Sequence, residues 1–108
     1  MLFPKGEEGH VIITSVDAAA WMLDAIRAGI ADASASQPIY DFGIIVNWIE
    51  KELNGEAIEE GVVEKDGALW SPANVKLNAD GSFELFLSSV LVTLENVDNP
   101  GLWANQGQ

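Results

Sequence analysis

The sequence predicts an α+β fold, in which a short N-terminal strand is followed by two helices packed on an antiparallel β-meander of three to four strands. Three observations predict this class. A β-branched run near the N-terminus is typical of a strand, and two segments between residues 16 and 54 place apolar residues at helical spacings. From residue 56 onward, short alternating runs are separated by turn residues, which indicates consecutive strands.

The N-terminal strand is expected at His10–Ile13, where the sequence reads HVII. Thr14–Asp17 has the spacing of a helix capping box, so the first helix is expected to begin there and to extend to about Ala33. The breaker-rich segment Ser34–Pro38 is then expected to form a loop. The apolar residues of this helix recur every three or four positions and share one face: Ala19, Met22, Leu23, Ile26 and Ile30.

The second helix is expected to begin near Asp41 and to end at Asn54-Gly55, because Gly tolerates the positive φ that helix ends require. Ile44 and Trp48 flank its main apolar stripe. Because the helix is expected to pack on the sheet, this stripe is the face that should contact it. The stripe comprises Phe42, Ile45, Val46, Ile49 and Leu53.

The tripeptide Asp41-Phe42-Gly43 matches the magnesium-binding tripeptide of protein kinases. A kinase also needs a glycine-rich loop, a strand lysine and a catalytic-loop aspartate in a chain more than twice as long, and this sequence contains none of those parts. Asp41 is therefore expected to cap the second helix, since its carboxylate can accept hydrogen bonds from free backbone amides.

The predicted meander is marked by two hairpin turn signals, Asp66-Gly67 and Asp80-Gly81. Pro72 indicates that the middle strand is interrupted or lies at an edge. In the last run the apolar residues change parity, so one long strand with a bulge or bend at Ser88-Ser89 is expected. The two sets are Phe83, Leu85 and Leu87, then Val90, Val92 and Leu94.

The chain of 108 residues is expected to form a single domain. Residues 1–9 and 99–108 are expected to be loosely ordered tails, although Leu102 and Trp103 could pack back onto the body. The N-terminus has no signal-peptide pattern and no apolar run is long enough to span a membrane. The absence of cysteine is compatible with a reducing compartment, so a cytoplasmic location is expected.

Charge dominates the composition, with 17 acidic and 5 basic side chains and a formal net charge of -12. A strongly anionic surface repels phosphate backbones and anionic lipids but attracts cationic proteins. Direct nucleic-acid and membrane binding are therefore not expected, whereas a basic protein target, such as a nucleic-acid-binding protein, is.

No catalytic, cofactor or metal site is predicted. The only histidine, His10, lies near Glu7 and Glu8 without a second histidine or a cysteine, which is weak support for a base or a ligand. The segment around Asp80-Gly81 suggests a calcium loop, but Lys76 and Leu87 would then occupy two ligand positions. There is no nucleophile elbow or phosphate-binding glycine loop.

The predicted partner-binding residues lie mainly in an acidic segment that contains only two cations, Lys51 and Lys65. A solvated face that keeps the protein monodisperse is the simpler explanation. Trp21, between Asp17 and Asp24 on the polar side of the first helix, is a further candidate anchor, unless it packs on the C-terminal tail or a second copy of the chain. The acidic segment comprises Glu50, Glu52, Glu56, Glu59, Glu60, Glu64 and Asp66.

Three hypotheses for the function follow. The first is a non-enzymatic acidic inhibitor, similar in composition to immunity proteins and phage anti-defence (anti-CRISPR) proteins that mimic nucleic acid. The second is a structural or assembly subunit, for example of a phage or mobile element, that acts by self-association, and a homodimer is compatible with it. The third is a small enzyme or ligand-binding domain, which would need a pocket that joins His10 or Tyr40 to a carboxylate of raised pKa.

Overall fold

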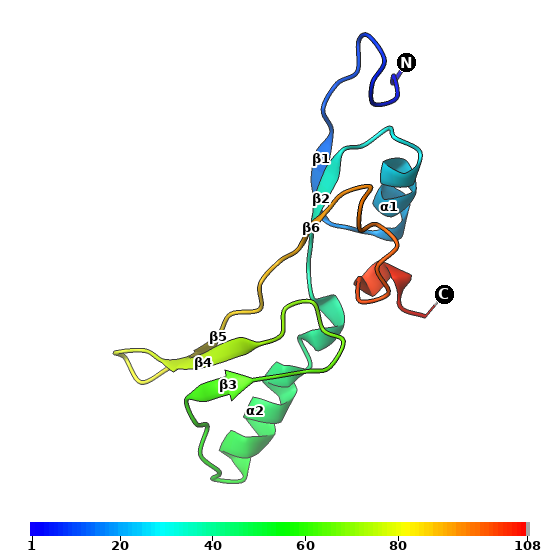
Figure 1. Cartoon of the computed structure of the whole chain (residues 1–108). Helices are drawn as coiled ribbons and strands as arrows, with labels where there is room; N and C mark the ends of the chain where they lie inside the picture. Colours follow the sequence, from blue (N-terminus) through cyan, green and yellow to red (C-terminus); the bar gives the residue numbers. More distant parts are fainter. Residues whose placement is uncertain (108) are drawn as a thin grey trace. The chain divides into compact units, whose positions relative to one another are not determined.

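The computed structural model describes residues 1–107, which form two compact units (Figure 1). The terminal unit consists of residues 1–37 together with the residues from Ser89 onward, and the inserted unit consists of Pro38–Ser88. The inserted unit thus interrupts the terminal unit in the sequence. A division by contacts does not measure whether the two units unfold together. The expectation of a single domain therefore stays a prediction. The α+β class itself is confirmed, with two α-helices and two three-stranded sheets.

The terminal unit is built around a three-stranded sheet in the order β1-β2-β6. β1 and β2 are parallel, with Thr14 opposite Ala33 and Asp17 opposite Ser36, and β6 is antiparallel to β2. A parallel pair needs a crossover connection, which α1 provides. The elements are β1 (Thr14–Asp17), α1 (Ala20–Arg27), β2 (Ala33–Ser36), β6 (Leu91–Val92) and the 3-10 helix η2 (Trp103–Asn105).

The start of the first helix differs from the prediction. The first strand lies at Thr14–Asp17, not at His10–Ile13, and α1 begins only at Ala20. Asp17 and Ala18 have φ values of 86° and 48°, which are left-handed backbone conformations that a helix cannot contain. The predicted capping box is therefore wrong, because its residues pair in a sheet.

The predicted loop at Ser34–Pro38 is also wrong in part, because Ala33–Ser36 forms the central strand β2. Its serines are buried, and their hydroxyls have partners inside the unit. The Ser34 hydroxyl accepts the Ala18 N–H at 3.0 Å, and that of Ser36 accepts the Val90 N–H at 3.3 Å. Internal hydrogen bonds allow these polar side chains in a core strand.

The core of the terminal unit confirms the central part of the predicted face of the first helix, since Met22, Leu23 and Ile26 are buried. The predicted extension of this helix to about Ala33 is wrong, because α1 ends at Arg27 and Ile30 lies beyond it. The C-terminal segment packs on the same core: Leu102 and Ala104 are buried, and η2 contacts α1. This packing corresponds to the second alternative predicted for the C-terminal residues, in which they pack back onto the body of the protein. The largest fully buried apolar side chains of the unit are Leu23, Ile26, Val92, Val97 and Leu102.

The inserted unit contains the predicted antiparallel meander, in the order β3-β4-β5. Its helix ends as expected, with Asn54 at the C-cap and Gly55 at a φ of 69°. The Asp80-Gly81 turn joins β4 to β5, where the Asn78 N–H donates to the Ser82 carbonyl at 2.8 Å. The elements are η1 (Ile39–Asp41), α2 (Ile44–Leu53), β3 (Gly61–Val63), β4 (Ala73–Leu77) and β5 (Phe83–Leu85).

The parity change near Ser88-Ser89 marks the end of the inserted unit in the sequence. A break was expected there, but within one long strand. The chain instead leaves the sheet of the inserted unit after Leu85 and enters the sheet of the terminal unit at Leu91. Of the two alternatives predicted for Pro72, the edge position is wrong, because β4 is the central strand of its sheet. The interruption is confirmed, because β4 begins at the residue after Pro72. Proline is tolerated there because the missing N–H lies outside the ladder.

Helix α2 lies along the sheet of the inserted unit (Figure 1). The face that it turns toward the sheet is not the predicted one. Trp48 contacts Phe83 edge-to-face at a centroid distance of 6.4 Å, and both Trp48 and Ile44 are half-buried. The stripe predicted to contact the sheet is exposed instead. The apolar residues of α2 span a wide arc that includes Ile44, Trp48 and the predicted stripe, and the polar residues lie opposite. The hydrophobic pattern therefore predicts an amphipathic helix without specifying which part of that arc is buried.

Candidate protein-binding surface

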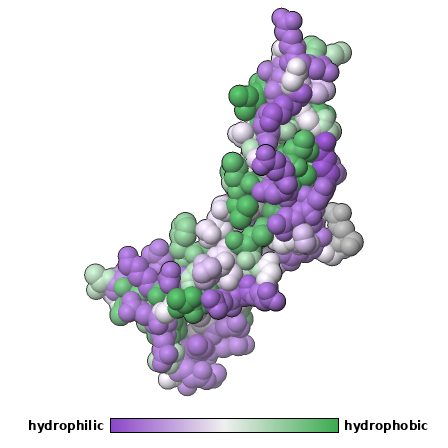
Figure 2. Space-filling model, in the orientation of Figure 1, coloured by the Kyte–Doolittle hydropathy of each residue, from purple (hydrophilic) through white to green (hydrophobic). Residues whose placement is uncertain are grey.

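All seven predicted residues of the acidic segment lie in the inserted unit and are exposed. They extend from the second half of α2, through the connection to β3, into the connection between β3 and β4. The inserted unit contains ten acidic and three basic side chains, a formal net charge of -7. Over the face drawn in Figure 2, hydrophilic residues cover much of the surface and hydrophobic patches interrupt them.

One of the two lysines in the segment is engaged elsewhere. The Lys65 ammonium pairs with a carboxylate oxygen of Asp41, and the other oxygen accepts the indole N–H of Trp70 at 2.7 Å. Partial burial alone would raise the pKa of Asp41, but the hydrogen bonds from Lys65 and Trp70, together with the lysine charge, lower it below its ordinary value. Lys65 is thereby directed to a carboxylate outside the acidic segment.

The predicted capping role of Asp41 is wrong. Asp41 lies in η1, and the N-cap of α2 is Gly43, which makes no side-chain cap hydrogen bond. The carboxylate instead bonds two side chains from the connection between β3 and β4, namely Lys65 and Trp70. Asp41 is a structural residue of the inserted unit, and nothing in the local sequence indicates partners so far along the chain.

Within residues 1–107, none of the seven acidic side chains forms an ion pair. Glu60 has a structural contact, because its carboxylate accepts the Leu77 N–H at 2.8 Å. The segment therefore presents negative charge that the inserted unit does not neutralise. Such a surface creates an electrostatic potential that attracts cationic partners.

The three remaining predicted partner residues, Asp17, Trp21 and Asp24, belong to the terminal unit. Trp21 is 67% exposed on the polar side of α1, so the alternative in which it packs on the C-terminal segment is wrong. In the C-terminal segment, the indole N–H of Trp103 donates to the Asp17 carbonyl. The ten predicted residues are thus divided between two units.

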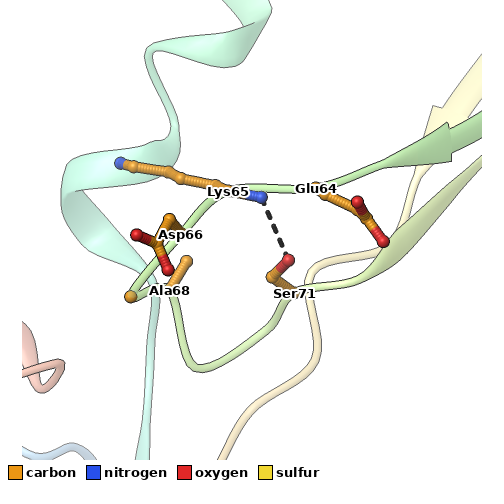
Figure 3. A pocket seen from close by; sticks show the side chains of 6 residues that line it. Glu64, Lys65, Asp66, Ala68 and Ser71 are labelled. Atoms are coloured by element: carbon orange, nitrogen blue, oxygen red, sulfur yellow. Dashed lines mark hydrogen bonds between the residues drawn. The ribbon is translucent and has the colours of Figure 1, made fainter.

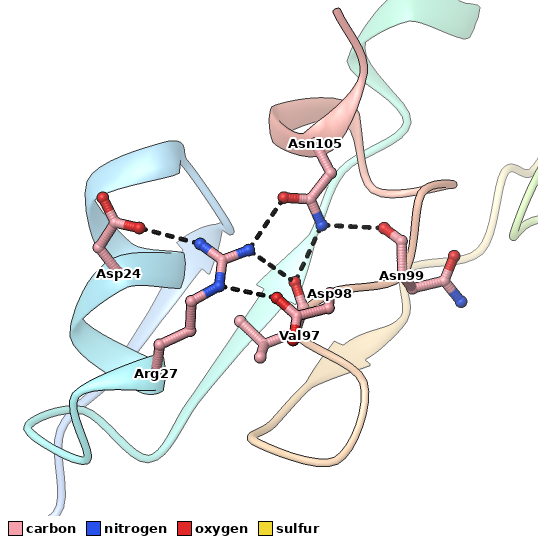
Figure 4. A network of polar contacts seen from close by, with 6 residues as sticks. All are labelled: Asp24, Arg27, Val97, Asp98, Asn99 and Asn105. Carbon is pink, nitrogen blue, oxygen red and sulfur yellow. Dashed lines mark hydrogen bonds and ion pairs between the residues drawn. The ribbon is translucent and has the colours of Figure 1, made fainter. Parts of the chain in front are cut away.

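Asp24 belongs to a network centred on Arg27, at the end of α1 (Figure 4). The guanidinium donates to Asp24 at 2.9 Å and to Asp98 at 2.8 Å, and also to the side-chain oxygen of Asn105 at 3.1 Å. It also donates to the Val97 carbonyl at 3.3 Å. The planar, multidentate guanidinium connects α1 to the C-terminal segment, so Asp24 has a structural partner.

A further pair, which the sequence did not indicate, joins His10 to Asp32. The His10 Nε2 lies 3.1 Å from the Asp32 carboxylate and its Nδ1 lies 2.6 Å from the Phe3 carbonyl. Asp32 also accepts the Ile13 N–H at 2.9 Å. The contact with the Phe3 carbonyl raises the pKa of His10, partial desolvation opposes it, and Asp32 adds to the rise. The partners lie 22 residues apart, beyond any local pattern.

A depression of about 380 Å³ lies in the connection between β3 and β4 (Figure 3). The Lys65 N–H donates to the Ser71 hydroxyl at 3.0 Å within it. Glu64 and Asp66 of the acidic segment line it together with Lys65. Neither His10 nor Tyr40 lines it, and the depression therefore adds no support to the hypothesis of a catalytic or ligand pocket.

The segment around Asp80-Gly81 is confirmed as a hairpin turn, the structure that was predicted in preference to a calcium loop. The Asp80 carboxylate accepts the N–H and the hydroxyl of Ser82 at 2.9 and 2.6 Å, which is the hydrogen bonding of a local turn. Over residues 1–107, no three His, Asp or Glu side chains are grouped so as to hold a metal ion. In that same part of the chain, no helix has both the length and the hydropathy needed to cross a bilayer.

Comparison with known protein families and with characterised proteins found no match to this sequence.

Proposed function

We propose that this protein is a non-enzymatic acidic binding module of the inhibitor or immunity and anti-defence type, which docks through its inserted unit on a basic surface of a target protein. The observation that carries the proposal is the exposure of all seven acidic residues of the segment on one compact unit of net charge -7. The target surface is expected to be one that otherwise binds nucleic acid, because closely spaced carboxylates resemble a phosphate backbone in charge.

Electrostatics supports this mode of action over direct chemistry. Like charges repel within a compact unit, so an acidic segment that is not neutralised internally opposes its own folding. Binding to a Lys/Arg-rich surface would remove that repulsion and release counterions, so the association should be fast and steeply dependent on salt. The same charge disfavours direct contact with nucleic acid or an anionic membrane. A reducing compartment such as the cytoplasm is part of this proposal, since the chain has no cysteine.

A second candidate function is self-association as a structural or assembly subunit. The observation that favours it is the exposure of large apolar side chains, including Trp21 at 67% and Phe86 at 73%. An interface made by such residues would tolerate salt, in contrast to the charged interface of the first proposal. The two candidates therefore give opposite responses to ionic strength.

The test is capture of partners by the tagged full chain at about 50 mM and about 500 mM salt, with and without duplex DNA as a competitor. The proposal expects a nucleic-acid-binding protein that is retained at low salt, released at high salt and displaced by DNA. The assembly alternative expects the chain to retain only itself, at both salt concentrations. A partner whose capture is insensitive to both salt and DNA would contradict the proposed charged interface.

A further inference from the structure

Helix α2 exposes a continuous row of large apolar side chains, which we call the α2 stripe. We propose that the α2 stripe, with the carboxylates beside it, is the docking site for an amphipathic helix of the partner whose apolar face is flanked by Lys or Arg. This inference rests on the proposed function, since it specifies the kind of partner segment that the inserted unit binds. The stripe consists of Phe42 at 52% exposure, Ile45 at 59%, Val46 at 55%, Ile49 at 53% and Leu53 at 81%.

The spacing of these residues makes the stripe a single surface. They lie three or four positions apart, so they share one face of α2 and of the turn that precedes it. Ten helical residues at about 1.5 Å each extend for about 15 Å, which matches two to three turns of a partner helix. Scattered exposed apolar residues are ordinary, whereas a contiguous row is typical of a binding surface.

The inserted unit does not use the stripe for its own core. The side of α2 that faces the sheet carries Ile44 and Trp48, and Trp48 contacts Phe83 there. The buried apolar residues of the unit come from the sheet and its connections: Trp70, Ala73 and Val75. The stripe therefore remains as an apolar face that the contacts within its unit do not cover.

The charges beside the α2 stripe indicate which kind of partner segment binds it. At 100° per residue, Glu50 lies beside Val46 on one edge of the stripe, and Glu52 lies beside Ile45 on the other edge. Lys51 projects from the opposite side of the helix, so both edges of the stripe are anionic. A partner helix with an apolar face and a cation on each side would complement this arrangement in hydrophobicity and in charge.

A second copy of the chain fits this site less well. An isologous contact places the same surface on both sides, so the carboxylates of Glu50 and Glu52 would meet like charges from the other copy. Each copy also has a net charge of -12. The anionic edges therefore favour a cationic helix over self-pairing of the stripe.

The experiment titrates the full chain into a fluorescent 18-residue Leu/Lys peptide with leucines at helical spacing. Two control peptides accompany it: one with the same composition but scrambled spacing, and one with Glu in place of Lys. The proposal expects the Leu/Lys peptide to bind at least about tenfold more tightly than either control. Equal binding of the ordered and scrambled peptides would overturn the stripe as the site. Equal binding of the Leu/Lys and Leu/Glu peptides would overturn the cationic partner.

Matched variants locate the binding on the chain. Val46→Asn in the stripe should weaken Leu/Lys binding about tenfold or more, whereas Val62→Asn, at a residue that is 65% exposed on β3, should leave it unchanged. Val46→Thr, which is nearly isosteric, replaces the Asn variant if circular dichroism shows that α2 is lost. Equal effects at the two positions would contradict the proposal, as would a salt-tolerant dimer of the wild type that Val46→Asn dissociates.

Failure of this inference is distinguishable from failure of the proposed function. If substitutions in the acidic segment abolish target capture while Val46→Asn leaves it intact, the acidic surface binds and the stripe inference alone is wrong. If neither kind of substitution affects capture, the proposed function is wrong as well.

Discussion

The two units of this protein use the same kinds of residues in opposite ways. In the terminal unit, α1 is amphipathic: Leu23 and Ile26 are buried against the core together with Leu102, whereas Trp21 is exposed. Arg27 and His10 have carboxylate partners. In the inserted unit five large apolar side chains of one helix face are more than half exposed, and the acidic segment forms no ion pair among the residues described. This contrast supports the proposal that the inserted unit carries the binding surface.

The largest expected effect comes from the core of the terminal unit. Leu23→Ala removes a side chain of 0% exposure and should lower the free energy of unfolding by about 2–5 kcal/mol. The matched change Leu53→Ala, in the α2 stripe at 81% exposure, should alter it by less than about 0.5 kcal/mol. Urea unfolding followed by circular dichroism measures both variants. Equal losses would show that the stripe is part of a core, and the contrast between the units would disappear.

The internal contacts of the inserted unit provide the next test. Trp70→Phe removes the indole N–H that Asp41 accepts, at a residue of 3% exposure, and should destabilise this unit by about 1.5–3 kcal/mol. Faster hydrogen exchange of the β4 amides would report this loss. Trp21→Phe, at an exposed position, is the control and should leave exchange in both units unchanged. Unchanged exchange in Trp70→Phe would show that the inserted unit does not depend on this contact.

A buried hydroxyl tests the terminal unit in a similar way. Ser34→Ala leaves the Ala18 N–H without its acceptor and should lower the free energy of unfolding by about 1–3 kcal/mol. Ser89→Ala, at an exposed position, serves as the control for loss of a serine hydroxyl. Equal stability of the two variants, measured by urea unfolding, would contradict the structural role assigned to the serines of β2.

The smallest expected effect is a pH dependence of the N-terminal segment. The pKa of His10 is raised above its ordinary value of 6.5, so protonated His10 stabilises the fold below that pH and this contribution is lost as the pH rises through the raised pKa. The pKa of Asp32 is lowered from 3.8, chiefly by the Ile13 N–H, so its contribution is present above that value and lost in acid. The pair is therefore most stabilising between these two ordinary values.

An NMR titration of the only histidine measures this directly. The His10 pKa should lie above 6.5 in the wild type and return toward that value in Asp32→Asn, and the pH dependence of the melting temperature should be smaller in His10→Gln. An unshifted His10 pKa would show that the pair does not form in solution.

Local signals in the sequence predicted several elements correctly. The C-terminal end of α2 follows from Asn54-Gly55, and the second hairpin follows from Asp80-Gly81, because both depend on the backbone freedom of one glycine. The buried face of α1 follows from a stripe with polar residues opposite it. The exposure of the acidic segment follows from the solvation of its carboxylates.

The elements that the sequence did not predict depend on contacts between distant residues. β2 is a strand because its serine hydroxyls find partners near Ala18 and Val90, and the strand signal of its own residues is weak. The face that α2 buries depends on the contact of Trp48 with Phe83, since apolar residues surround much of that helix. Asp41 resembles a helix cap in sequence, but its carboxylate accepts hydrogen bonds from Lys65 and Trp70 instead. In each case a tertiary partner decided between locally plausible alternatives.

The most direct test of the central claim is the dissociation constant of the captured target for two variants of equal net charge. One carries Glu56→Gln, Glu59→Gln and Glu64→Gln in the inserted unit, and the other carries Glu7→Gln, Glu8→Gln and Glu95→Gln in the terminal unit, all at exposed positions. We predict that the first set weakens binding by about 100-fold or more at low salt and flattens the salt dependence, while the second changes affinity by less than about threefold. Equal weakening by both sets, or by neither, would contradict the account, because the acidic segment would then serve only to keep the protein soluble.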